Sequence, residues 1–201
     1  MSIFLTSDTH FCHDKDFLYR PRGYNNIKDM NEDLVQKWND TITNEDIVYF
    51  LGDLCLTDTT AALEYIKRLN GSAIFWIFGN HDTKNKVDLI KENCQKFIPC
   101  GTSTVIKYHK ISCLLSHYPT ITSNYDEKHF NQHVINFHGH THQQSNFINV
   151  SNPFMYHVGI DSHNGYPVKI DNAIDEIREN WMQLDKMVNI NNIQNSWSAA
   201  H

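Results

Sequence analysis

The amino-acid sequence predicts an α/β (α+β) sandwich in which two mixed β-sheets are flanked by helices. Apolar runs of strand length alternate with helical patterns in the first half of the chain, and the second half is richer in short strands. In addition, five of the expected strands are followed closely by an aspartate, an asparagine or a histidine. The chain of 201 residues suits one substantial domain, so we expect a single domain over residues 1–201.

The first half of the chain predicts a sheet covered by helices. Three apolar runs of strand length stop at a polar residue or a glycine, namely Ile3–Ser7, Ile47–Leu51 and Ala73–Phe78. Three further segments place apolar residues at helical spacing, namely Ile27–Trp38, Ala61–Leu69 and Val87–Cys94. The pair Asn70-Gly71 ends the second of these helices.

The second half of the chain predicts a second sheet. Thr104–Tyr108 and Ile111–Ser116 have the pattern of paired strands around the turn His109-Lys110. Three more short strands are expected at Val134–His138, Ser145–Val150 and Met155–Ile160. From about residue 171 the apolar spacing indicates a C-terminal helix, which we expect to fray after Val188, where asparagine becomes frequent.

Composition limits the class of protein. The formal net charge of -6 argues against a protein that wraps a nucleic-acid backbone, which usually has a basic surface. The five cysteines have no CxxC spacing, which favours reduced thiols over a disulfide framework, with a Cys94–Cys100 bridge as the alternative. The sequence starts without a signal-peptide pattern, and no apolar stretch reaches the roughly 18 residues of a membrane span. We therefore expect a cytoplasmic protein without membrane contact.

Two tripeptides offer pairs of side chains that bind metal ions. In Asp8-Thr9-His10 and in His140-Thr141-His142 the polar side chains are two residues apart, so an extended backbone points both to one side. Either tripeptide alone is more simply interpreted as a solvated loop. Together with Asp53, Asn80–Asp82 and His117 they form five blocks after expected strands, where layered α/β folds build their sites.

The order of these blocks resembles that of the calcineurin-like metallophosphoesterases, in which D-x-H, G-D, G-N-H-D, H and G-H-x-H follow one another. Here a glycine precedes three of the blocks, at Gly52, Gly79 and Gly139, where close backbone approach favours a residue without a Cβ. Flanking segments are similar to the small bacterial and phage-type branch, among them Ser7–Phe11, Tyr49–Leu54, Ser116–Pro119 and Val158–Asp161. Cys12 departs from the glycine that such relatives often carry before the histidine, which bears on the shape of the first loop.

The resemblance implies a centre for two divalent transition-metal ions. One ion would be held by Asp8, His10, Asp53 and His142, and the other by Asp53, Asn80, His117 and His140. Asp53 would bridge them, because a carboxylate has two oxygens. Imidazole-rich ligation suits Mn²⁺, Fe, Ni²⁺ or Zn²⁺ better than Mg²⁺ or Ca²⁺, and the resemblance favours Mn²⁺.

The resemblance also implies a hydrolase of phosphate esters, in which a hydroxide bridging the two ions attacks the phosphorus. His81 resembles the family's histidine that stabilises charge and protonates the leaving oxygen. We expect Asp82 to hydrogen-bond the far nitrogen of His81, and an N-terminal helix cap is its alternative role.

The expected substrate is a small phosphate monoester or diester, such as a nucleotide or a cyclic nucleotide. A nuclease is one alternative, which the acidic charge and the lack of a sizeable capping domain disfavour. A catalytically silent binding scaffold is the other, which the intact ligand positions and His81 disfavour.

Three further residues are weaker candidates for substrate binding. His13 follows the first ligand pair by three residues and would face the substrate. Arg20 and Arg22 offer guanidinium groups that match phosphate oxygens, although a solvated loop is the simpler interpretation of both. Tyr118 is expected at the rim of the site, and Asp161 is interpreted as a residue that stabilises its loop.

Overall fold

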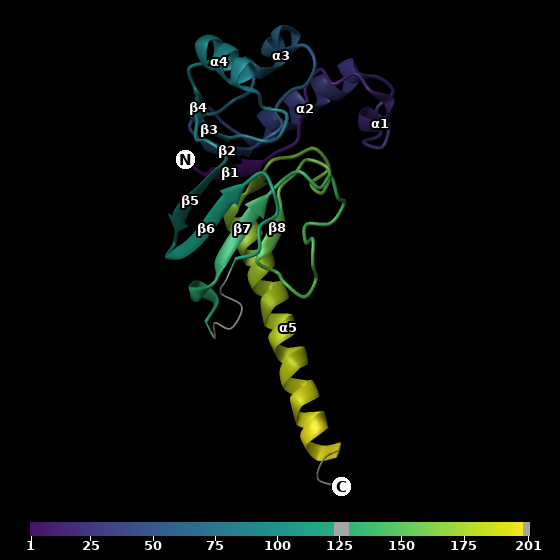
Figure 1. Cartoon of the computed structure of the whole chain (residues 1–201), viewed down its shortest axis with the longest axis vertical. Helices are drawn as coiled ribbons and strands as arrows, with labels where there is room; N and C mark the ends of the chain where they lie inside the picture. Colours follow the sequence, from purple (N-terminus) through teal and green to yellow (C-terminus); the bar gives the residue numbers. More distant parts are fainter. Residues whose placement is uncertain (123–128, 199–201) are drawn as a thin grey trace.

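The computed structural model describes residues 1–122 and 129–198, and its first sheet lies beneath a layer of helices (Figure 1). The strand order in this sheet is β4-β3-β2-β1-β9. Its members are β1 (Ile3–Thr6), β2 (Ile47–Leu51), β3 (Ala73–Ile77), β4 (Phe97–Pro99) and β9 (Val168–Lys169). The strands β1 to β4 pair in parallel, whereas β9 is antiparallel to β1. The carboxyl ends of β1, β2 and β3 therefore meet at one edge of the sheet.

The second sheet has the strand order β5-β6-β7-β8. Its members are β5 (Ser103–Tyr108), β6 (Ile111–Ser116), β7 (Val134–His138) and β8 (Met155–His157). The expected hairpin is present, with Tyr108 opposite Ile111, and β6, β7 and β8 pair in parallel. Both sheets are mixed and both are accompanied by helices, so the predicted fold class is confirmed.

The helices lie on the outer side of each sheet. The first sheet is covered by α2 (Ile27–Thr41), α3 (Thr59–Ile66) and α4 (Lys84–Asn93), and the short α1 (Asp16–Tyr19) lies beside α2. The amphipathic face of α2 buries Met30, Leu34, Val35 and Trp38, as its spacing predicts. The second sheet is followed by the long helix α5 (Ile170–Ser198), and a 3₁₀ turn, η1 (Phe130–Gln132), precedes β7.

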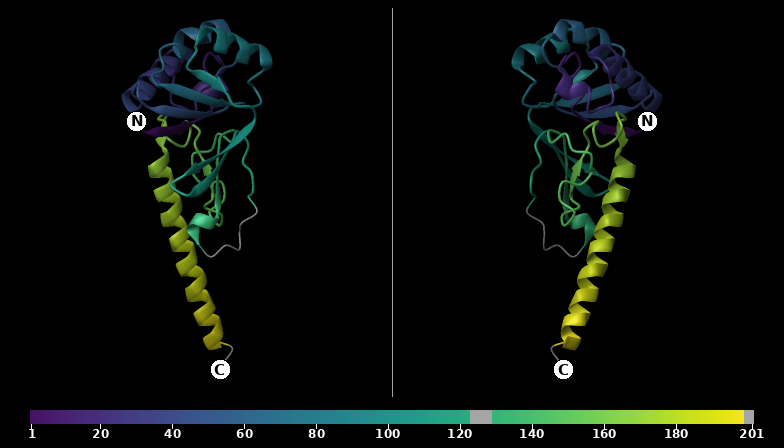
Figure 2. Two further views of the ribbon diagram at one scale, coloured as in Figure 1. Left: turned by 90° about the vertical axis from the view of Figure 1, so that its left-hand side faces the viewer. Right: turned by 90° about the vertical axis from the view of Figure 1, so that its right-hand side faces the viewer.

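Two apolar cores hold these layers together. One fills the space between the first sheet and α2, α3 and α4, and it contains the fully buried Trp38, Phe50 and Trp76. The other lies between the two sheets and the first turns of α5, where Leu51, Phe137 and Ile174 are buried. Beyond these turns α5 runs along the second sheet and continues past the body of the molecule (Figure 2).

One expected strand is not formed, because Ser145–Val150 makes turns with a single bridge from Phe147 to Tyr156. Helix α5 continues to Ser198, beyond Val188, where we expected fraying to begin. All five cysteines are free, in agreement with the favoured reduced thiols, so the alternative Cys94–Cys100 bridge is absent. Among the described residues no helix is both long and apolar enough to cross a membrane.

The two sheets meet where the polar blocks lie. Ser7, directly after β1, forms a parallel bridge with Gly159, two residues after β8. The Ile160 amide also donates to the Ser7 carbonyl at 3.3 Å. The strand ends of both sheets thus form one edge, and the loops that leave β1, β2, β3, β6 and β7 open onto it.

Candidate metal centre

The structure brings the seven predicted metal ligands together at this edge. Asp8 and His10 follow β1, Asp53 follows β2 and Asn80 follows β3. From the second sheet, His117 follows β6 directly, and His140 and His142 follow β7. Five of these residues have a positive φ, between 48° and 70°, namely Asp8, His10, Asp53, His140 and His142. Such a backbone is unfavourable for residues with a Cβ, and its clustering is typical of a functional site.

The glycines of the motif are required by close contacts. A Cβ on Gly79 would lie 2.2 Å from Asp53 Oδ1, and a Cβ on Gly139 would lie 2.4 Å from Asp8 Oδ2. A Cβ on Gly52 would meet the His117 ring at 2.5 Å. Cys12, which departs from the related sequences, has a φ of 62°, the backbone conformation that glycine suits best. Its loop is held by Asn31, whose side-chain oxygen accepts from the Cys12 amide at 3.3 Å.

The first predicted ligand set surrounds the Nε2 atom of His10. This atom lies 3.2 Å from His142 Nε2, 3.7 Å from Asp53 Oδ2 and 3.9 Å from Asp8 Oδ1. His142 Nε2 is also 3.8 Å from Asp8 Oδ1. One ligand atom from each of Asp8, His10 and His142 lies within 4.8 Å of the others, a spacing that could hold a metal ion.

The second predicted set converges on the amide oxygen of Asn80. His117 Nε2 lies 3.0 Å and His140 Nδ1 lies 3.1 Å from Asn80 Oδ1, and the two ring nitrogens are 3.2 Å apart. Asp53 Oδ2 is 3.4 Å from His117 Nε2, so the Asp53 carboxylate borders both sets. Asp8, Asp53 and His117 form a second group with the spacing of a metal site.

The contacts of His117 are compatible with a cation beside its Nε2 atom. Its Nδ1 lies 2.8 Å from the Leu51 carbonyl, which only accepts, so Nδ1 carries the proton. In the neutral ring Nε2 then presents a lone pair to Asn80 Oδ1, another acceptor, at 3.0 Å. Two lone pairs at this distance repel unless a cation or an additional proton lies between them. A donor set of imidazole, carboxylate and amide groups suits divalent transition metals.

Burial and neighbouring charges shift the pKa values of the candidate ligands. Asp8 is fully buried, and burial raises the pKa of its carboxyl above the usual value. Burial also favours the protonated form of Asp53, but the hydrogen bond and the charge of His117 outweigh it and lower the pKa of Asp53 to about 2. Burial lowers the pKa of His10 well below its usual value, so its ring stays neutral, the form that binds metals.

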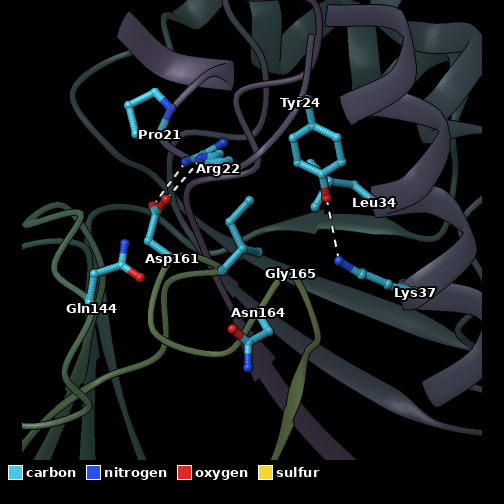
Figure 3. A pocket seen from close by; sticks show the side chains of 10 residues that line it. Pro21, Arg22, Tyr24, Leu34, Lys37, Gln144, Asp161, Asn164 and Gly165 are labelled. Atoms are coloured by element: carbon cyan, nitrogen blue, oxygen red, sulfur yellow. Dashed lines mark hydrogen bonds and ion pairs between the residues drawn. The ribbon is translucent and has the colours of Figure 1, made fainter. Parts of the chain in front are cut away.

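His142 is oriented by a buried ion pair that sequence reasoning did not assign to the site. Its Nδ1 lies 2.8 Å from Asp161 Oδ2, and Asp161 in turn accepts from Arg22 at 2.8 and 2.9 Å (Figure 3). The side chains of Arg22 and Asp161 are only 7% and 6% exposed. A carboxylate of this kind fixes the tautomer and the direction of a metal-binding histidine. The only indication in the sequence of a special role for Arg22 was that the chain has just four arginines.

Arg22 is therefore engaged within the protein, whereas its expected contact with substrate phosphate stays a prediction. Its Nη2 also donates to the Asp8 carbonyl at 2.9 Å, and Nη1 donates to the Thr9 carbonyl at 3.3 Å. Arg22 thus holds the backbone of the Asp8–His10 block. Arg20 lies on the surface, where it donates to Asp16 at 2.7 Å and is 58% exposed.

Asp82 has a different partner from the one expected. Its Oδ2 accepts from the amides of Asp53 and Gly79, each at 2.8 Å, and from Trp76 Nε1 at 3.2 Å, while Oδ1 accepts from the Leu54 amide at 3.2 Å. Both oxygens are thus engaged with the loops after β2 and β3. The expected hydrogen bond to the His81 ring is wrong, and α4 begins after Thr83, so Asp82 is not its cap.

His81 and His13 lie together on the open side of the first ligand set. The His81 side chain is 42% exposed, and its Nε2 lies 3.9 Å from Asp53 Oδ2. Its backbone amide donates to Asp53 Oδ1 at 2.9 Å. The rings of His81 and His13 lie 5.6 and 5.8 Å from the His10 ring. Both histidines therefore border the first ligand set.

Tyr118 stands at the rim of the second ligand set, as expected. Its ring is half-exposed and packs edge-on against His117 and His140, at centroid distances of 5.2 and 4.6 Å.

Comparison with known proteins identifies the family. The family model described as the calcineurin-like phosphoesterase superfamily domain matches residues 1–155. An uncharacterised protein of the archaeon Methanocaldococcus jannaschii, MJ1445, is 36% identical over 148 residues, which cover 67% of this chain and 84% of that protein. The Gene 66 protein of Mycobacterium phage D29 is 28% identical over 211 aligned positions, covering 89% of this chain and 94% of the phage protein.

A crystal structure from Aquifex aeolicus, of the protein of unknown function AQ665, has the same fold. It superimposes with a TM-score of 0.64 at 21% identity and covers 88% of this chain and 98% of that one. The protein described here belongs to the calcineurin-like phosphoesterase superfamily, and the phage relative agrees with the bacterial and phage-type branch. It is accordingly a metal-dependent hydrolase of the phosphoesterase class.

Proposed function

We propose that the protein hydrolyses small phosphate monoesters or diesters at a dinuclear metal centre. The observation that carries this proposal is the convergence of seven candidate ligand residues from both sheets, with His117 Nε2 and Asn80 Oδ1 only 3.0 Å apart. Asp8, His10, Asp53 and His142 would hold one ion, and Asp53, Asn80, His117 and His140 the other. Two such ions supply positive charge for phosphoryl oxygens and lower the pKa of bound water.

Asp53, His81 and His13 would have three different roles in the reaction. Asp53 Oδ2 lies near His10 of one ligand set and His117 of the other, so the Asp53 carboxylate would contact both ions. His81 lies 3.9 Å from Asp53 and is open to solvent, which suits a group that donates a proton to the leaving oxygen. His13, beside His10, would contact the substrate on the same side.

Mn²⁺ is the activating ion that we propose, with Fe, Ni²⁺ and Zn²⁺ as alternatives, because the ligands are mainly imidazole nitrogens and carboxylate oxygens. The proposed partner is a small phosphorylated molecule such as a nucleotide or a cyclic nucleotide. A nuclease is less favoured because the net charge is -6 and nucleic-acid binding depends on neutralisation of phosphates by lysine and arginine.

A panel of esters tests the proposal. The protein would be stripped of metal, supplied with Mn²⁺ and assayed with p-nitrophenyl phosphate, its bis-ester, 2′,3′- and 3′,5′-cyclic nucleotides and DNA. We expect metal-dependent turnover of at least one small ester and little cleavage of DNA. Preferred cleavage of DNA would favour the nuclease. A protein that binds Mn²⁺ and hydrolyses no ester of the panel would be a silent scaffold, and the proposal would be wrong.

A further inference from the structure

A cavity of about 220 Å³, lined by the residues drawn in Figure 3, lies beside the predicted metal centre and shares a wall with it. The shared wall is the Arg22–Asp161 pair, whose Asp161 contacts His142 at 2.8 Å. The opposite wall is formed by Leu34 and Lys37 of α2. The cavity is larger than the roughly 150 Å³ of an apolar cavity that holds benzene, so a single ring with substituents fits in it.

The charged groups in the wall are all paired. Arg22 forms two hydrogen bonds with Asp161 and two with backbone carbonyls. The Lys37 ammonium lies 2.8 Å from Asp33 and 3.4 Å from the Tyr24 hydroxyl. No charge in the lining is therefore left to bind a phosphate or a free cation, and a charged ligand would lose hydration without gaining a partner. The cavity favours a neutral ligand.

The hydrogen-bonding capacity of the cavity comes from two amides. Gln144 and Asn164 both line it and are exposed, and within residues 1–122 and 129–198 neither side-chain amide has a protein hydrogen-bond partner. Each amide offers an oxygen acceptor and two N–H donors. The buried side chains of Leu34 and Ile160 supply apolar contact between them. Ligand sites commonly combine apolar contact with a few convergent polar groups of this kind.

We propose that this cavity is a second ligand site, separate from the metal centre, which binds a neutral heterocycle of the nucleobase type. Such a ring has apolar faces for Leu34 and Ile160 and an edge with donors and acceptors for Gln144 and Asn164. Because the ligand also contacts the Arg22–Asp161 pair, its binding acts on the carboxylate that orients His142. Metal affinity and ligand affinity are therefore coupled, and the coupling is reciprocal.

Binding of adenosine to metal-free protein tests the proposal, since a nucleoside lacks phosphate and the result does not depend on esterase activity. In ¹H–¹⁵N NMR titrations we expect shifts of the Gln144 and Asn164 side-chain amides with Kd on the order of 0.1–1 mM, typical of a small ligand. The double variant Gln144→Leu, Asn164→Gly lacks both side-chain amides, so its affinity is read from the backbone amide signals of the cavity lining. It should bind adenosine about tenfold or more weakly, the effect of roughly one or two lost hydrogen bonds. Glycine suits position 164, where φ is 53°.

A matched control is available one residue away. Gln143 is outside the cavity lining, and its amide donates to the Ser145 carbonyl at 2.7 Å, so Gln143→Ala should leave adenosine binding unchanged. In metal-loaded protein, inorganic phosphate should not displace adenosine. The proposal would be overturned if none of adenosine, guanosine, cytidine and uridine shifts the two amides. Displacement by phosphate, or equal losses in the double variant and the control, would also overturn it.

Discussion

The substitution Asp161→Asn tests whether Asp161 orients His142, because it leaves every candidate metal ligand in place. Asparagine has nearly the same shape as aspartate, but an NH₂ group replaces one of the two carboxylate oxygens. In the wild-type protein each of these oxygens accepts a hydrogen bond from the Arg22 guanidinium, and one of them also accepts from His142 Nδ1. At either place a donor meets a donor at 2.8–2.9 Å. In either arrangement His142 loses its charged acceptor, so we expect the tautomer and orientation of its ring to be held less firmly.

The magnitude follows from the kind of contact that is lost. Removing the hydrogen-bond partner of a metal-binding histidine usually weakens metal binding by about 10- to 100-fold, which corresponds to roughly 1.4–2.7 kcal/mol. The same change leaves the Arg22 charge buried without an anion. Breaking a buried ion pair lowers the free energy of unfolding by about 3–5 kcal/mol. Because the amide oxygen of asparagine still accepts a hydrogen bond, the loss should be near the lower value.

Competition between the protein and a fluorescent chelator for Mn²⁺ gives the metal affinity, and urea unfolding of metal-free protein gives the free energy of unfolding. Asp171→Asn is the control, because Asp171 accepts a hydrogen bond from Tyr108 at 2.7 Å and its side chain is 38% exposed. The control should keep wild-type metal affinity. A folded Asp161→Asn protein that binds Mn²⁺ within twofold of wild type would refute the assignment of Asp161 as a positioning residue.

Four further outcomes are expected. His81→Ala should retain both metal ions and lower turnover by about 10²–10⁴-fold, and unchanged turnover of an alkyl ester would contradict its role as an acid. Gly79→Ala should reduce metal content measured by mass spectrometry, because its Cβ would lie 2.2 Å from Asp53 Oδ1, and normal content would show that the loop adapts. Burial raises the pKa of the Cys55 thiol to about 12, so iodoacetamide at pH 8 should leave Cys55 unmodified until the protein unfolds, and rapid labelling in native protein would count against the buried position. Hydrogen bonds from Thr43 and Ser2 lower the pKa of Asp46 below 3.8, so its stabilising effect is present above that pH and lost as the pH falls below it. The difference in Tm between wild type and Asp46→Asn should accordingly narrow from pH 7 to pH 3, and a constant difference would exclude an ionic contribution.

The bounds of β2 match the expected range, as its uninterrupted apolar run predicts, and those of β7 match as well, although Asn136 interrupts its apolar pattern. The prediction of a strand at Ser145–Val150 was wrong because polar side chains of this segment form hydrogen bonds with the nearby backbone. Ser145 Oγ accepts from the Phe147 amide at 3.2 Å, and Asn149 Oδ1 accepts from the Ser151 amide at 2.9 Å. Such local bonds compete with sheet pairing, and alternation of apolar residues alone does not reveal them.

The candidate ligands were predictable for a different reason. Each follows a strand, and parallel strands bring such positions to one edge without any knowledge of side-chain contacts. The partners of these ligands were not predictable in the same way. Asp161 lies 19 residues from His142 along the chain, and Arg22 lies 120 residues from it, so only the tertiary fold reveals the network.

Asp82 shows why adjacency in a motif is a poor guide to contact. Its neighbour His81 turns toward solvent, whereas the Asp82 carboxylate turns inward and accepts four hydrogen bonds, two of them from the amides of Asp53 and Gly79. Asp53 borders both predicted ligand sets, and Gly79 directly precedes the candidate ligand Asn80. A single buried carboxylate that holds no metal thus sets the distance between the loops after β2 and β3. The geometry of the centre therefore depends on Asp82 as much as on its ligands, because displacing either loop would move Asp53 relative to Asn80.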